Sequence, residues 1–214
     1  MPDSVKSLEH DKARRMRADL PDRLADHDTA DGRMDGDVGV VVGLGATFSG
    51  KSVRSAAEVR VRYLETAGIF ATYEDGFGAA SSDPVRVLAT GIELRPLFLG
   101  RWVTGTELGL TWSDLVIDSF GLEVGAFFEQ PPYGSFGAGE ANRGLQAGIG
   151  IELPILGRDN GPWIDLHGGG RWSDSTLGGA QVAGPSDRAL YLTVTLAYHA
   201  SFVAHLVDAN DRAP

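Results

Sequence analysis

Residues 143–156 have the sequence RGLQAGIGIELPIL, in which apolar side chains alternate with small or polar ones. The apolar set is Leu145, Ala147, Ile149, Ile151, Leu153 and Ile155. The intervening set is Gly144, Gln146, Gly148, Gly150 and Glu152. Because successive side chains of a β-strand point to opposite faces, the segment predicts a strand with one apolar and one polar face.

The same alternation recurs along most of the chain, with turn-forming segments between the stretches. It predicts further strands at residues 38–49, 56–64, 69–74, 85–99, 114–129, 162–173 and 189–202. The parity continues through the short turn at 65–68, so residues 56–74 could also form one long strand, and 100–113 stay unassigned. About eight strands with almost no helix predict an all-β fold, a closed antiparallel up-and-down barrel.

Composition divides the chain into three parts. Residues 1–37 carry seven Lys or Arg and ten Asp or Glu, with few large apolar residues, which predicts a mobile or weakly helical tail. Residues 38–203 form the predicted barrel domain, and residues 204–214 form a polar C-terminal tail.

Bulk properties exclude several classes of function. A net charge of −10 argues against a nucleic-acid partner, and the absence of Cys removes disulfides and Cys-based zinc sites. No apolar run reaches the roughly 18 to 20 residues of a membrane-spanning helix, although barrel strands escape that test. Residues 1–20 are charged throughout and do not fit a signal peptide, which leaves a mature form or a cytosolic chain.

The polar face of the predicted strands indicates which side faces inward. It consists mainly of Gly with a few charges of both signs, and the chain has a single Lys after residue 37, Lys51. Small residues and pairable charges suit the crowded lumen of a narrow membrane barrel, whereas a soluble barrel would put its apolar face inside. The predicted lumen network consists of Glu58, Arg60, Arg62, Glu93, Arg95, Glu123, Glu152, Asp165, His167 and Arg171.

On this pattern the chain resembles the small eight-stranded outer-membrane β-barrel proteins of Gram-negative bacteria. The resemblance covers about residues 38–202 and implies insertion in the cell outer membrane as a monomer. Such proteins are anchors, adhesion or resistance proteins, or occasionally lipid-modifying enzymes. It implies the lipid bilayer as a partner, with periplasmic or surface proteins as further candidates. Phe202 takes the place of the terminal aromatic of such chains, although residues 203–214 follow it.

We therefore expect a porin-like barrel whose lumen is filled by side chains, with a structural or surface-interaction role and no catalytic residue, metal or cofactor. The alternative is a soluble or lipid-tethered ligand-binding barrel.

A third hypothesis comes from the segment GATFSGKS, which matches a phosphate-binding loop through Gly45, Gly50, Lys51 and Ser52. Such a loop needs a helix after it, but residues 57–63 alternate as a strand does. A hairpin at the end of a strand is the preferred interpretation, and a nucleotide-binding enzyme is the alternative.

Two further groups have catalytic alternatives. His199 and Ser201 share one strand face, as does the His–Ser pair of barrel lipid A deacylases. Asp165, His167 and Arg171 could form a metal or acid–base cluster. Both groups are interpreted here as polar residues of the lumen.

Overall fold

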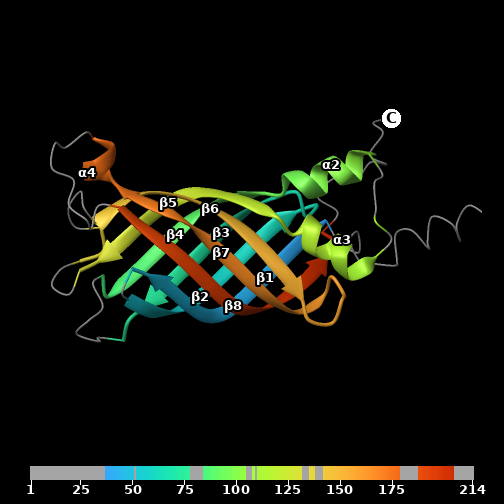
Figure 1. The fold of residues 1–214 in the computed structure, drawn as a ribbon, viewed down its shortest axis with the longest axis horizontal. Helices are drawn as coiled ribbons and strands as arrows, with labels where there is room; N and C mark the ends of the chain where they lie inside the picture. Colours follow the sequence, from blue (N-terminus) through green and yellow to red (C-terminus); the bar gives the residue numbers. More distant parts are fainter. Residues whose placement is uncertain are drawn as a thin grey trace, which may run out of the picture.

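The computed structural model describes residues 37–50, 52–77, 84–104, 108, 110–131, 135–137, 142–178 and 188–204. It is a closed barrel in which each strand pairs antiparallel with its sequence neighbours and β8 pairs with β1 (Figure 1). The predicted fold class is confirmed. The strands are β1 (Val38–Ser49), β2 (Ser52–Tyr63), β3 (Ala67–Asp75), β4 (Arg86–Leu94), β5 (Gly121–Gln130), β6 (Arg143–Pro154), β7 (Gly161–Ser173) and β8 (Arg188–Phe202).

The seam between β1 and β8 closes the barrel. Val38 lies opposite Phe202 and Ser49 lies opposite Tyr191, so the seam runs along the whole of β1. Closure leaves no sheet edge with unpaired backbone groups. We call the end with Val38 and Phe202 the terminal end, and the opposite end, where β1 turns into β2, the hairpin end.

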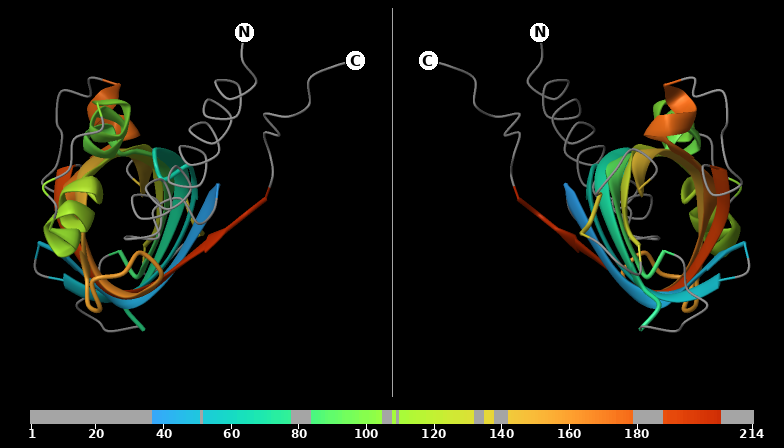
Figure 2. Two further views of the ribbon diagram at one scale, coloured as in Figure 1. Left: turned by 90° about the vertical axis from the view of Figure 1, so that its right-hand side faces the viewer. Right: turned by 90° about the vertical axis from the view of Figure 1, so that its left-hand side faces the viewer.

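The predicted near absence of helix is wrong. Between β4 and β5 the chain forms α2 (Pro96–Thr104) and α3 (Thr111–Asp118), and α4 (Asp174–Leu177) follows β7. Figure 2 shows α2 and α3 outside the barrel wall, and Figure 1 places them at the terminal end, with α4 at the hairpin end. No helix in the described part of the chain is long and apolar enough to cross a membrane.

The helices α2 and α3 shorten two predicted strands. The strand predicted at 85–99 ends at Leu94, and the strand predicted at 114–129 begins at Gly121. Pro96 has no N–H to donate to a sheet and is well suited to the first turn of a helix.

Two turns correct the remaining boundaries. Strand β2 begins four residues earlier than predicted, because Ser49 already pairs with Ser52. Gly50 adopts the positive φ of 57° that this tight turn requires. At the other end of β2, Leu64 and Glu65 also have positive φ, so 56–74 forms two strands and not one.

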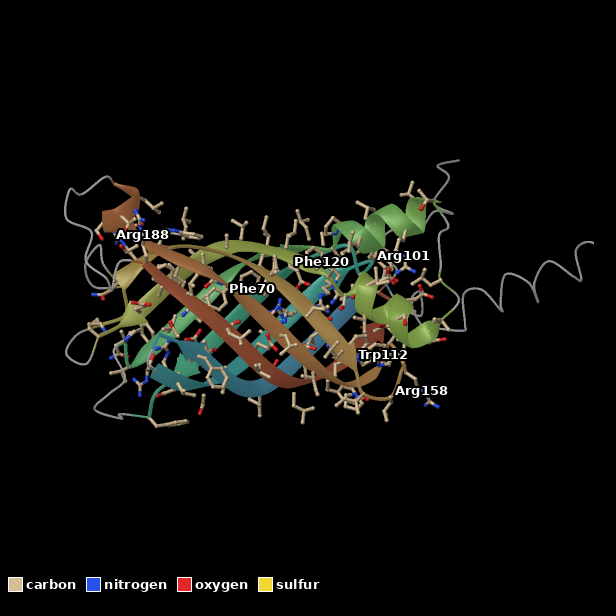
Figure 3. The ribbon with its side chains drawn as sticks, in the orientation of Figure 1. Phe70, Arg101, Trp112, Phe120, Arg158 and Arg188 are labelled. Atoms are coloured by element: carbon tan, nitrogen blue, oxygen red, sulfur yellow. The ribbon has the colours of Figure 1, made fainter. Side chains whose placement is uncertain are left out.

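The apolar face of the strands points outward. Val59 is 43% exposed, Ile149 55% and Leu192 47%, all from the middle of their strands. Figure 3 shows side chains that contain only carbon projecting from the outer sides of the barrel, and many side-chain nitrogen and oxygen atoms towards its middle. The predicted tails, 1–37 and 204–214, lie outside the described residues except for Asp37 and Ala204.

Candidate functional site

The candidate site is the charged lumen. All ten residues predicted for the lumen network are buried. Glu58, Arg60 and Arg62 enter the lumen one after another from β2, because alternate residues of a strand share a face. The others come from the opposite strands or from the residue after β4, and they are Glu93, Arg95, Glu123, Glu152, Asp165, His167 and Arg171.

Arg60 forms the centre of the network. Its guanidinium lies 3.0 Å from the carboxylate of Glu58, 3.0 Å from that of Glu93 and 2.5 Å from that of Glu123. These acids come from β2, β4 and β5, so one cation bridges the lumen. Its planar fork of donors lets an arginine serve several carboxylates at once.

A second cluster lies toward the terminal end. Arg62 and Arg95 both pair with the carboxylate of Glu152, and Arg62 also lies 3.1 Å from Glu93. Arg95 reaches Glu65 at 3.1 Å in the turn between β2 and β3. The cluster therefore joins the middle of the lumen to its terminal end.

A third cluster, toward the hairpin end, was only partly predicted. Glu74 of β3 lies 2.9 Å from Arg54 and 2.5 Å from Arg171, and the Arg171 guanidinium lies 4.5 Å from the centre of the Tyr191 ring. Arg54 has the parity of Arg60 and would have been found had the predicted strand begun at Ser52. Glu74 also has the lumen parity of its strand.

Asp165 differs from the other lumen acids. It pairs with His199, whose Nε2 lies 3.2 Å from Asp165 Oδ2, and no arginine forms an ion pair with it among the described residues. The His199 ring stacks on Trp163 with 4.6 Å between ring centres. His167 Nδ1 lies 2.8 Å from Glu123 Oε1.

The geometry does not assemble the catalytic pair of His199 and Ser201. Ser201 Oγ donates to Asp159 Oδ2 at 3.2 Å, and the Ser201 N–H donates to Asn160. The Nε2 of His199 is directed at Asp165 instead. His199 is therefore not placed to activate this serine.

The phosphate-loop motif spans a hairpin. Gly45 lies within β1, Gly50 lies in the turn, and Ser52 begins β2 with its hydroxyl donating to the Ser49 carbonyl at 2.9 Å. Lys51 lies outside the described residues. The helix that a phosphate loop needs is replaced by strand β2, so the match lacks its structural context.

The helices at the terminal end bury charge and expose apolar side chains. Arg101 of α2 pairs with Asp114 and, at 2.7 Å, with Asp118 of α3. Leu97 and Val103 of α2 are exposed. In α3, Trp112 is exposed as well, and its indole donates to the Pro154 carbonyl of β6 at 2.9 Å (Figure 3).

A titratable group lies where the lumen meets this end. Asp159, in the turn between β6 and β7, accepts the hydrogen bond of Ser201. Burial, together with the nearby charge of Glu65, raises the pKa of the Asp159 carboxyl to about 7.

The comparisons with known proteins include a weak structural similarity. No family model matches the sequence. No curated protein matches it. Among solved structures, the chain is similar to the N-terminal β-barrel domain of Pseudomonas aeruginosa OprF, with 9% sequence identity and a TM-score of 0.37, covering 76% of this chain and 98% of that chain. A likeness of this degree carries no argument about function, which has to come from the side chains themselves.

Proposed function

We propose that the chain is an outer-membrane β-barrel of a Gram-negative bacterium with a lumen filled by side chains. The observation that carries the proposal is its inverted pattern of burial. Charged side chains such as Arg60 and Glu152 are at most 1% exposed, whereas mid-strand Leu, Ile and Val side chains are exposed all around the wall. The exposed set includes Val42, Leu44, Val59, Val61, Ile69, Ile92, Val124, Leu145, Ile149, Leu192 and Leu196.

Water is a poor solvent for such a wall. Apolar surface left in water costs roughly 25 cal/mol per Å², and soluble monomers rarely expose contiguous apolar patches larger than a few hundred Å². A bilayer removes this cost, and a closed barrel meets its requirement that every backbone polar group be paired. The partner that this surface fits is therefore the lipid bilayer.

The helices α2 and α3 support a membrane setting. Their charged side chains pair with one another, since Arg101 of α2 contacts Asp114 and Asp118 of α3. Their apolar side chains Leu97, Val103 and Trp112 are exposed. Trp at the rim of an apolar belt suits the interfacial layer of a bilayer. We infer that this pair of helices lies at the membrane surface on the terminal side.

The filled lumen favours a structural or surface-interaction role over transport. The three ion-pair clusters occupy the barrel from the level of Glu74 to that of Arg95, and a barrel of eight strands has an interior that side chains fill. A wide aqueous pore does not fit this interior, and the described contacts assemble no nucleophile with its base.

Membrane insertion provides the test. The protein, exported behind a signal peptide, should fractionate with outer membranes, resist alkaline extraction, and show heat-modifiable migration on gels after detergent extraction. In planar bilayers it should form no steady, wide conducting pore. A stable, monodisperse monomer in buffer without detergent would contradict the proposal and favour a soluble barrel.

A further inference from the structure

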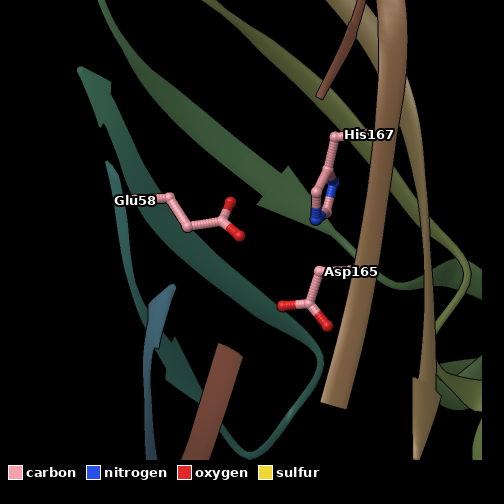
Figure 4. A group of neighbouring side chains, drawn as sticks. All are labelled: Glu58, Asp165 and His167. Atoms are coloured by element: carbon pink, nitrogen blue, oxygen red, sulfur yellow. The ribbon is translucent and has the colours of Figure 1, made fainter. Parts of the chain in front are cut away.

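Three lumen side chains of β2 and β7 lie close together, and in the described part of the chain two of them carry buried polar atoms without a hydrogen-bond partner. They are Glu58 of β2 and Asp165 and His167 of β7 (Figure 4). One carboxylate oxygen or ring nitrogen from each lies within 4.8 Å of the others. Among the described residues, Asp165 Oδ1 and both ring nitrogens of His167 have no hydrogen-bond partner, although Asp165 is 0% and His167 3% exposed.

Such atoms are costly in a protein interior, because a buried polar atom without a partner loses its hydration without compensation. The buried charges of the lumen also do not balance. The buried barrel charges comprise five arginines against six acids, Arg54, Arg60, Arg62, Arg95 and Arg171 against Glu58, Glu74, Glu93, Glu123, Glu152 and Asp165. Among the described residues, Asp165 is the buried barrel acid that pairs with no arginine, and its ion-pair partner is His199.

Partners outside the group hold each of the three side chains, and those of Glu58 contact both of its carboxylate oxygens. His167 Nδ1 lies 2.8 Å from Glu123 Oε1 without hydrogen-bond geometry, so the carboxylate lies beside the ring and Nε2 stays available. His199 lies on Asp165 Oδ2 and leaves Oδ1 free. Glu58 is fixed by Arg60 and by the Thr195 hydroxyl.

A small cavity lies beside two of these side chains. A cavity of about 10 Å³ is lined in part by Glu58, His167 and Tyr191, which is close to the volume that one water needs. The Tyr191 hydroxyl is itself buried without a hydrogen-bond partner. A metal-bound water in this cavity would therefore have a hydrogen-bonding group beside it.

We propose that Glu58, Asp165 and His167 bind a divalent transition-metal ion, with Zn²⁺ as the best match, and that a water completes its coordination. One imidazole and two carboxylates with an open fourth position suit Zn²⁺, whereas Ca²⁺ and Mg²⁺ prefer sets of six or more oxygens. The ion would place positive charge beside the acid that pairs with no arginine, and it would satisfy Asp165 Oδ1 and one ring nitrogen of His167. This site goes beyond the barrel's proposed function and does not depend on its location in a membrane.

Metal titration tests the site. Full-length protein, folded in detergent and stripped with a chelator, should bind one Zn²⁺ per chain by calorimetry, with Mg²⁺ and Ca²⁺ giving no comparable signal. Asp165→Asn and His167→Gln should each remove binding at this site. Glu123→Gln should weaken it about 10- to 100-fold, because that carboxylate lies beside the His167 ring.

The controls separate this site from adventitious binding. His10, His27 and His205 lie outside the described residues, and changing all three to Ala should leave the stoichiometry unchanged. Wild-type protein loaded with Co²⁺ should show the intense visible bands of a four-coordinate site, a readout that needs no variant to fold. Heat-modifiable migration on gels verifies the fold of each variant.

The proposal fails if the wild-type protein binds no Zn²⁺, or if folded Asp165→Asn and His167→Gln variants bind it as the wild type does. It also fails if His199→Gln weakens binding more than His167→Gln. That result would place the ion between Glu152, Asp165 and His199, which also lie close enough to hold one.

Discussion

The lumen and the outer wall of this barrel are built from the same strands but solve opposite solvation problems. In the lumen, Arg60 is 1% exposed and its charge is balanced by three carboxylates. One residue along the strand, Val61 carries no polar group and is 38% exposed. The difference shows that alternation by itself does not say what is inside; the chemistry of each face does.

The largest expected effect comes from removing the central lumen cation. Arg60→Met leaves Glu58 without its arginine and Glu123 with only His167, so we expect a loss of about 3–5 kcal/mol in the free energy of unfolding. Urea unfolding followed by tryptophan fluorescence measures it. The matched control is Arg143→Met, which breaks an exposed pair with Asp174 and should cost about 0–1 kcal/mol. Equal losses would mean that water screens the charges of the lumen as much as it screens the exposed pair of Arg143 and Asp174.

An arginine placed on the outer wall tests whether that wall faces hydrocarbon. Ile149→Arg should cost about 2–4 kcal/mol in a bilayer, because its position is near the middle of β6 and arginine is most costly at the membrane midplane. Leu190→Arg, near the hairpin end of β8, should cost about 0–1 kcal/mol. The folded fraction in phospholipid vesicles measures both. If depth makes no difference, the wall does not face hydrocarbon.

Tight packing of the inner face predicts a smaller effect. A Cβ at Gly91 would overlap the backbone carbonyl of Val124 on the neighbouring strand, so Gly91→Ala should cost about 1–3 kcal/mol. Gly100 lies in α2 with open space around its Cα, and Gly100→Ala should be stabilising by about 0.5–1 kcal/mol. Thermal unfolding of the two variants compares them, and a neutral Gly91→Ala would show that the strands can move apart.

The smallest effect concerns Asp159, at the boundary between lumen and water. Its pKa is raised to about 7 from the ordinary value of 3.8, so the folded protein holds this proton more tightly than the unfolded chain. The resulting stability is fully present below about pH 4 and is lost as the pH rises through about 7. Asp159 is partly exposed, so we expect a change on the order of 1 kcal/mol. Unfolding between about pH 5 and pH 8 should show this slope in the wild type and not in Asp159→Asn.

Period-two alternation made most of the barrel predictable. A strand has only two faces, so deciding which face one residue occupies places every side chain of that strand. This alternation predicted Glu58, Glu123 and Arg171 as lumen residues without any homologue. The scarcity of lysine and the abundance of Gly on the polar face then separated a lumen from a water-exposed surface.

The rest could not be derived from alternation. Helices α2 and α3 were missed because each spans only nine or eight residues, too few for an apolar periodicity to identify, and because the ion pairs of Arg101 with Asp114 and Asp118 exist only once the helices are formed. Partners across the lumen, such as Arg62 and Glu152, depend on the stagger of strands that are far apart in sequence. The leftover atoms of Asp165 and His167 become apparent only when every other partner has been placed.

The cross-lumen ion pairs also bear on how the barrel assembles. Arg60 of β2 reaches Glu123 of β5, Arg62 reaches Glu152 of β6, and Arg171 of β7 reaches Glu74 of β3. None of these strands are neighbours in the sheet, so hairpins that form one after another cannot make these contacts. A half-built sheet would present unpaired charges on its concave side, and these disfavour entry into hydrocarbon. If the barrel inserts in a membrane as proposed, folding and insertion should be coupled to closure of the seam between β1 and β8, and partly closed sheets should be sparsely populated.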